Sequence, residues 1–147
     1  MSLWDDTKQG MESPSLGKEL DDLEIYKSNL LLYSMVDRAY ERWDDVVAKF
    51  AEVAPIEERL AQACRDANLI PKMRTHQLSA ASCWAKAGNF HRAVLLADEM
   101  LADPDLDDRY RERMEGLRAR WKERRATLIK TLDTEDEIGD TLGKSVK

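Results

Sequence analysis

The chain has 147 residues, of which 43% are apolar and 35% are charged, and its formal net charge at pH 7 is −6. This length is typical of one domain with a sizeable core, and the negative charge disfavours the whole molecule as a nucleic-acid binder. Two widely spaced cysteines without a C-x-x-C pair form neither a disulfide framework nor a zinc motif, and no apolar run reaches the ~20 residues of a bilayer span. We therefore expect a cytoplasmic protein that does not enter a membrane.

The first third of the chain changes character near residue 19. Residues 1–18 are rich in glycine, proline and serine, and such a segment buries too little to offset its chain entropy, so we expect a flexible arm. Over residues 19–53 apolar side chains recur every three or four positions, which predicts one face of a helix. This stretch forms either one long helix or two helices joined near residues 42–45, and Pro55 is expected to end it.

The same spacing continues through the rest of the chain. It predicts further helices over residues 56–67, 72–87, 90–101 and 106–133. After Asp133 the sequence is polar and contains glycine, so we expect a flexible acidic tail over residues 134–147. No alternating apolar run predicts a strand. The prediction is a single all-α domain over residues 19–133, with about five helices arranged in antiparallel hairpins.

Residues 80–101, with the sequence AASCWAKAGNFHRAVLLADEML, carry little charge before Asp98. The small side chains that would let two helix backbones approach closely are Ala81, Ala93 and Ala97. The large side chains that would fill the space beside them are Trp84, Phe90 and Met100. Gly88 stands where the first of these helices must end, because glycine adopts the left-handed backbone conformation without a Cβ clash. The segment therefore predicts an antiparallel helical hairpin over residues 73–102.

This hairpin resembles a tetratricopeptide repeat, a 34-residue unit of two helices, over about residues 74–105. The matching positions are the small residue Ala81, the aromatic Trp84, the turn residue Gly88, the second aromatic Phe90 and the characteristic alanine Ala93. The first helix departs from the motif at Gln77, where tryptophan is common. The resemblance implies a tetratricopeptide-like arrangement, either a right-handed superhelix or a bundle, and a role in protein interaction.

Members of that family bind peptides in a concave groove lined by the first helix of each unit. The resemblance implies a partner-binding groove lined by Thr75, Leu78, Ser82 and Lys86. In the version of the family that grips a C-terminal carboxylate, lysine and asparagine occupy the positions that Leu78 and Ser82 hold here, so that mode is not implied. Plain solvent exposure of this face is the alternative.

Residues 109–130 form a basic segment with nine lysines and arginines and three glutamates. Its candidate basic surface comprises Arg118, Arg120, Arg124 and Arg125, which could contact phosphates and make the chain an accessory nucleic-acid binder. The alternative is a solvated helix face that the acidic residues of 103–108 and of the tail partly balance. An acidic protein partner is favoured over nucleic acid.

Catalytic and metal-binding motifs are absent from the sequence. His76 and His91 are the side chains whose unperturbed pKa lies near neutrality, and with Cys64 or Cys83 they would suggest a metal site. No H-x-x-x-H, E-x-x-H or C-x-x-C spacing supports such a site, and no glycine-rich phosphate loop occurs. We therefore expect no catalytic residues, no metal and no cofactor.

The preferred interpretation is a non-catalytic protein-interaction or assembly module with a protein or peptide partner. The first alternative is a self-associating structural bundle, because a first and a last helix that extend past the hairpin would leave apolar strips that need covering. The two helices could also cover each other. A nucleic-acid binder acting through residues 109–130 is the more distant alternative.

Overall fold

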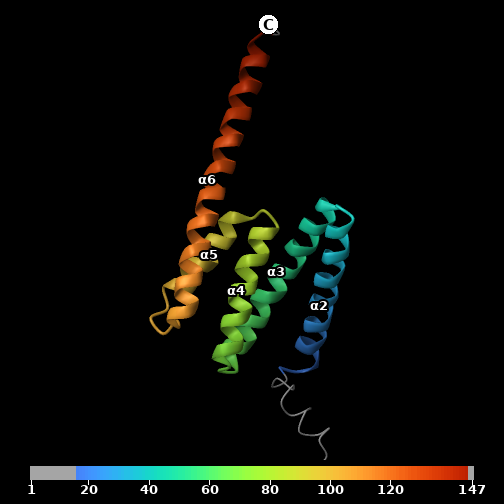
Figure 1. Cartoon of the computed structure of the whole chain (residues 1–147), viewed down its shortest axis with the longest axis vertical. Coiled ribbons are helices and arrows are strands. Elements are labelled where there is room, and N and C mark those ends of the chain that lie inside the picture. The colour runs from blue at the N-terminus through green and yellow to red at the C-terminus, as the bar shows by residue number, and fades with distance from the viewer. Residues whose placement is uncertain (1–15, 146–147) are drawn as a thin grey trace, which may run out of the picture.

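The computed structural model of the chain describes residues 16–145, and its side chains up to residue 134. Over residues 16–145 it contains only helices, which confirms the all-α fold. They are α2 (Lys18–Ala39), α3 (Trp43–Asp66), α4 (Ile70–Lys86), α5 (Phe90–Leu101) and α6 (Asp108–Ser145). Each helix packs on the next one along the chain (Figure 1). In the described part of the chain, no helix has both the length and the apolar composition needed to cross a membrane. Most of the predicted N-terminal arm lies outside the described residues.

Three of the four connections between helices share one backbone geometry. Glu41, Asn68 and Gly88 have positive φ angles of 58°, 57° and 82°. The residue after each donates its backbone N–H to the carbonyl five positions earlier, at 2.8 Å from Arg42 to Asp37, 2.8 Å from Leu69 to Cys64 and 2.9 Å from Asn89 to Trp84. This is the Schellman pattern of helix ends. The hairpin turn predicted at Gly88 is therefore confirmed, and the same turn recurs twice without a glycine.

The prediction that Pro55 ends a helix is wrong. α3 runs from Trp43 to Asp66 with Pro55 inside it, and the chain instead breaks at residues 40–42, between α2 and α3. Proline removes the N–H that would bond the carbonyl of Ala51. Both Pro55 and Ala51 are exposed, so that carbonyl lies on the side of the helix where water can bond it. The predicted helix over residues 56–67 is therefore the second half of α3.

α6 also differs from its predicted length, because it continues to Ser145 and does not end at Asp133. The predicted tail over residues 134–147 is thus helical as far as Ser145. It contains no proline, and the isolated glycines at 139 and 143 each cost a helix only about 1 kcal/mol. The distal part of α6 projects well beyond the other helices (Figure 1).

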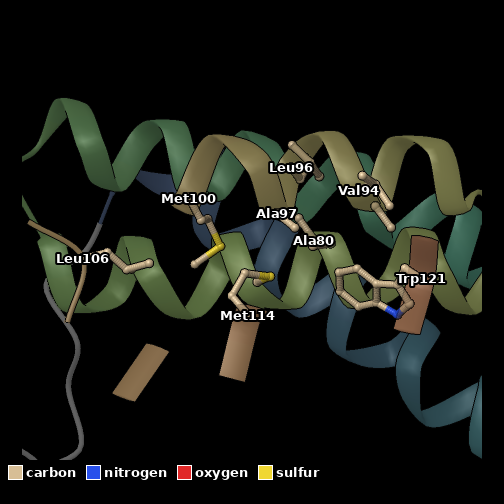
Figure 2. Close-up of a cluster of buried hydrophobic side chains, with 10 residues drawn as sticks. Ala80, Val94, Leu96, Ala97, Met100, Leu106, Met114 and Trp121 are labelled. Carbon is tan, nitrogen blue, oxygen red and sulfur yellow. The ribbon is translucent and has the colours of Figure 1, made fainter. Parts of the chain in front are cut away.

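The main hydrophobic core lies between α4, α5 and α6 (Figure 2). Its small side chains, Ala81, Ala93 and Ala97, are fully buried, as the hairpin prediction required. Met114 and Trp121 of α6 pack against them. A second cluster joins α2, α3 and α4 through Val53, Ala54 and Cys83, with Leu30, Leu31 and Phe50 packed on it. α4 contributes to both clusters and thereby joins the two ends of the molecule.

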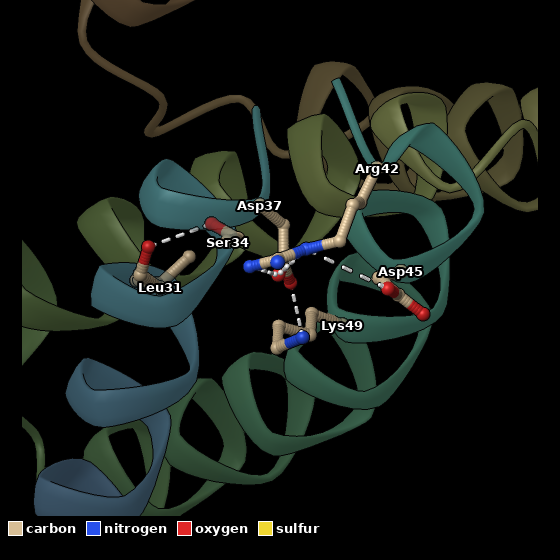
Figure 3. Close-up of polar contacts among 6 residues, drawn as sticks. All are labelled: Leu31, Ser34, Asp37, Arg42, Asp45 and Lys49. Carbon is tan, nitrogen blue, oxygen red and sulfur yellow. Dashed lines mark hydrogen bonds and ion pairs between the residues drawn. The ribbon is translucent and has the colours of Figure 1, made fainter. Parts of the chain in front are cut away.

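A polar cluster fixes the turn between α2 and α3 (Figure 3). Asp37 accepts hydrogen bonds from Arg42 Nε, at 3.1 Å, and from Lys49 Nζ. Ser34 donates to the carbonyl of Leu31 at 2.6 Å. Since Arg42 lies in the turn and Lys49 lies in α3, the Asp37 carboxylate ties the end of α2 to the start of the next helix.

α2 is apolar on its outer face as well as on its packed face. The exposed side chains include Ile25, Leu32, Tyr33, Met35 and Val36. α2 and α6 lie at opposite ends of the row of helices, with α2 packed on α3 and α6 packed on α5. The first and last helices of the described part therefore do not cover each other.

Candidate functional site

A groove of about 410 Å³ lies between the C-terminal half of α4 and the middle of α6. Its lining residues are Ser82, Ala85, Lys86, Phe90, Leu117, Arg120, Trp121 and Arg124. Ser82 and Lys86 come from the predicted partner-binding face, and Arg120 and Arg124 come from the predicted basic segment. The structure therefore brings together residues that the sequence suggested for two separate surfaces.

The floor of the groove is apolar. Leu117 and Trp121 are one helical turn apart on the face of α6 that packs against α5. Trp121 is 6% exposed, whereas Leu117 and Phe90 are half-buried and pack against the main core. Ala85 has a small side chain and leaves room above the floor. The floor thus offers a place for an apolar side chain of a ligand.

The rim of the groove carries three positive charges, from Lys86, Arg120 and Arg124. The Lys86 ammonium lies 5.1 Å from the centre of the Phe50 ring of α3, in a cation–π contact, and forms no ion pair with a described side chain. Arg120 and Arg124 are exposed and form no ion pair with any described side chain. The groove lining contains no carboxylate, so its potential is locally positive on a molecule whose net charge is −6.

The other predicted surface residues lie outside the groove. Thr75 Oγ1 donates to the Pro71 carbonyl at 3.2 Å and lies 3.4 Å from the Tyr110 hydroxyl. Leu78 is half-buried against the main core. Arg118 forms an ion pair with Asp98 of α5, so its charge is already paired within the chain. Arg125 is half-buried and does not line the groove.

The apolar face of α6 continues past the groove. Leu128 and Leu132 follow Trp121 by seven and eleven positions, so they extend the same face of the helix. Beyond the end of α5 that face is uncovered, and the exposed fractions of Leu128 and Leu132 are 46% and 51%. The groove therefore opens onto an apolar strip that runs along the projecting helix.

A buried charged cluster between α2, α3 and α4 was not predicted. Glu57 is 2% exposed, and its Oε1 lies 2.7 Å from Lys27 Nζ and 3.4 Å from His76 Nδ1. His76 Nε2 lies 3.6 Å from Oε1 of Glu24. Burial acts to raise the pKa of the Glu57 carboxyl, but its polar contacts with His76, Lys27 and Ser79 outweigh burial and lower the pKa below its ordinary value.

This cluster holds helices together and does not form a reaction site. Lys27, Glu57 and His76 are 19 to 49 positions apart in sequence, so no spacing motif could have revealed the cluster. A general acid or base must reach its substrate, whereas the side chains of Lys27, Glu57 and His76 are at most 13% exposed. The cluster therefore joins α2, α3 and α4 through the Lys27–Glu57 ion pair and the polar contacts of His76.

The histidines and cysteines do not form one site. His91 is exposed on α5, while His76 belongs to the buried cluster. Cys64 and Cys83 are free and buried, and burial raises the pKa of both thiols. The described residues contain no group of three or more histidine, cysteine, aspartate or glutamate side chains placed to hold a metal ion.

The groove between α4 and α6 thus combines an apolar floor, a cationic rim and an adjoining apolar strip. These are the features that an acidic amphipathic helix would complement, because its apolar side chains fill the floor and its carboxylates meet the rim. Comparison of the chain with protein-family models, with curated proteins and with solved structures found no match.

Proposed function

We propose that this chain is a non-catalytic, cytoplasmic protein-interaction module of tetratricopeptide-like type, and that its α4–α6 groove binds an acidic amphipathic helix of a partner. The observation that carries the proposal is that Lys86, Arg120 and Arg124 line the groove beside its apolar floor. Arg120 and Arg124 form no ion pair with a described side chain, so their charges are available to carboxylates of a ligand. The Lys86 ammonium would exchange its contact with the Phe50 ring for such a carboxylate.

A helical ligand fits better than an extended one. The apolar strip from Trp121 to Leu132 follows the axis of α6, and a second helix laid along it would bury side chains at intervals of three and four residues. Arginine binds carboxylates through two parallel hydrogen bonds, which would orient such a helix on the rim.

Nucleic acid is the competing ligand, since arginines also bind phosphates. Three rim cations would neutralise only a few phosphates, and the net charge of −6 opposes a polyanion. The apolar floor favours the helix further, because an aliphatic side chain can fill it.

Binding of an acidic amphipathic peptide, followed by fluorescence anisotropy, tests the proposal. The double variant Arg120→Glu/Arg124→Glu should weaken binding by more than about tenfold, because it places two carboxylates opposite those of the peptide. Arg109→Glu/Arg113→Glu is the matched control, since these exposed arginines are also four positions apart on α6 but lie outside the groove.

Equal loss in the two double variants would show that only net charge matters, and the groove assignment would be wrong. Tighter binding of a single-stranded oligonucleotide than of the peptide would favour the nucleic-acid alternative. A peptide whose apolar residues are replaced by serine should also bind weakly, because the floor would then be empty.

A further inference from the structure

We propose that the acidic helix which occupies the groove is the distal part of α6, residues 133–145, from a second copy of this chain. Two chains would then form an antiparallel dimer through their projecting helices. The inference rests on the proposed function, for which it names the partner of the groove.

The charge of α6 reverses along its length. Residues 120–130 contain five lysines and arginines and one glutamate, whereas residues 133–140 contain five aspartates and glutamates and no cation. The basic part lies at the groove, and the acidic part lies beyond the end of the other helices. One helix thus carries both a cationic surface and an acidic segment of the kind that this surface would bind.

The two parts cannot meet within one chain. Arg120 and Asp140 are twenty positions apart on a continuous helix, which separates them by about 30 Å. The acidic segment therefore cannot fold back on the rim of its own groove while α6 stays helical. A second copy supplies the same segment from outside.

An antiparallel arrangement matches the charges in a single register. If the two-fold axis passes near residue 130, position 120 of one helix is level with position 140 of the other, and position 124 is level with position 136. The basic residues 120–130 of one helix then lie alongside the acidic residues 133–140 of the other, and Leu128 of each helix is level with Leu132 of the other. A parallel arrangement in register would instead place the basic parts against each other and the acidic parts against each other, which is unfavourable.

The projecting helix also needs a partner for its apolar face. Residues 126–134 of α6 are all exposed, and the helix continues to Ser145 beyond the other helices (Figure 1). A polar helix that projects in this way is only marginally stable alone in water. Leu128 and Leu132 are half-exposed there. In the proposed register each lies level with the other in the second copy, so one association buries the strip and neutralises the rim.

Sedimentation velocity of the full chain tests the dimer. The wild-type chain should sediment as a dimer at micromolar concentration and dissociate as salt is raised, because salt screens the rim charges. Arg120→Glu/Arg124→Glu and Asp136→Arg/Asp140→Arg should each raise the dissociation constant by more than about tenfold. An equimolar mixture of these two variants should form a heterodimer, because each restores opposite charges to the other. Arg109→Glu/Arg113→Glu is the control and should remain a dimer.

The outcomes separate this inference from the proposed function. A monomeric wild-type chain whose groove still binds the acidic peptide overturns the dimer and leaves the function standing. A monomeric chain that binds no acidic peptide overturns both. If each charge-reversed variant is monomeric and helical by circular dichroism but the mixture does not associate, the antiparallel register is wrong. Dimers that persist in both variants overturn the role of the groove in self-association.

Discussion

Asp37 is 6% exposed at the end of α2, where it accepts hydrogen bonds from Arg42 and Lys49 (Figure 3). Hydrogen bonds from Lys49, followed by those from Arg42, lower the pKa of this carboxyl although burial opposes them. The charged form is therefore the one that holds the turn. At the turn between α2 and α3, the Asp37 carboxylate favours one backbone geometry, as the glycine favours it at the turn of Gly88.

The substitution Asp37→Asn should lower the melting temperature by several degrees. The amide keeps the size of the side chain but cannot pair with two cations. Thermal unfolding followed by circular dichroism measures the effect. Asp22→Asn is the control on the same helix, since Asp22 is exposed. Equal melting temperatures for the two variants would show that the carboxylate of Asp37 does not hold the turn.

Glu57 should make the stability depend on pH in the acid range. Its pKa is lower in the folded chain than its ordinary value, so its contribution is fully present above the unfolded pKa of about 4.3 and is lost as the pH falls through the folded pKa. Glu57→Gln should cost about 3–5 kcal/mol, because it leaves Lys27 buried without its charge partner.

Urea unfolding between pH 3 and pH 7 measures this dependence. The free energy of unfolding of the wild-type chain should fall more steeply toward acid than that of Glu57→Gln. The same slope in both proteins would assign the acid sensitivity to other carboxylates.

The three Schellman turns share one backbone geometry, but the residues that signal this geometry in the sequence differ from turn to turn. Gly88 predicts its turn from the sequence, because glycine adopts positive φ freely. Asn68 is also common in this conformation, and Pro71 follows it. Glu41 gives no signal, since the left-handed region costs a glutamate about 1–2 kcal/mol. The predicted break near residues 42–45 therefore lies later in the chain than the observed break at residues 40–42.

Glu41→Gly should therefore stabilise the protein by about 0.5–1 kcal/mol. The gain in backbone conformation exceeds the extra entropy that glycine loses on folding. Gly88→Ala should act in the opposite direction, by about 1 kcal/mol. Because no heavy atom lies within 4 Å of a Cβ built at Gly88, the cost would come from the backbone alone. Chemical denaturation of the two variants measures both signs, and a destabilised Glu41→Gly would contradict the argument.

The α4–α5 hairpin was predictable because its determinants are local. Its helices were predicted over residues 72–87 and 90–101 and are observed over Ile70–Lys86 and Phe90–Leu101. Ala93→Leu should lower stability by about 1–3 kcal/mol, since Ala93 is fully buried in the main core and extra methyl groups would overpack it. Ala119→Leu, at an exposed position on α6, is the control. Similar melting temperatures for both variants would contradict close packing of α4 on α5.

At the scale of the whole molecule, extensive helix contacts within residues 16–145 join only neighbours along the chain. The groove was therefore only half predictable. Lys86 and Arg120 belong to two separate sequence patterns. The packing of α6 on α5 brings them to one site, and the connection over residues 102–107 positions α6 for that packing. The Glu57–His76 cluster was not predictable at all, because nothing local relates its residues.

The rate of amide hydrogen exchange in each helix should reflect how many neighbouring helices it packs against. Amides in α4, which packs on both α3 and α5, should exchange more than about tenfold more slowly than those in α2, which packs extensively only on α3. Mass spectrometry of exchanged peptides measures the difference. Equal protection across α2 and α4 would mean that the chain opens only as a single cooperative unit.

The position of α6 at the end of the row has a consequence for biosynthesis. Because each helix of the described chain makes extensive contacts only with its neighbours in sequence, the helices can pack in order as they leave the ribosome, without waiting for a distant segment. The groove between α4 and α6 is different, since Leu117 to Arg124 emerge after the residues of α4 and α5 that face them. If this groove binds the proposed partner, a nascent chain has no competent binding surface until residues 117–124 of α6 have emerged.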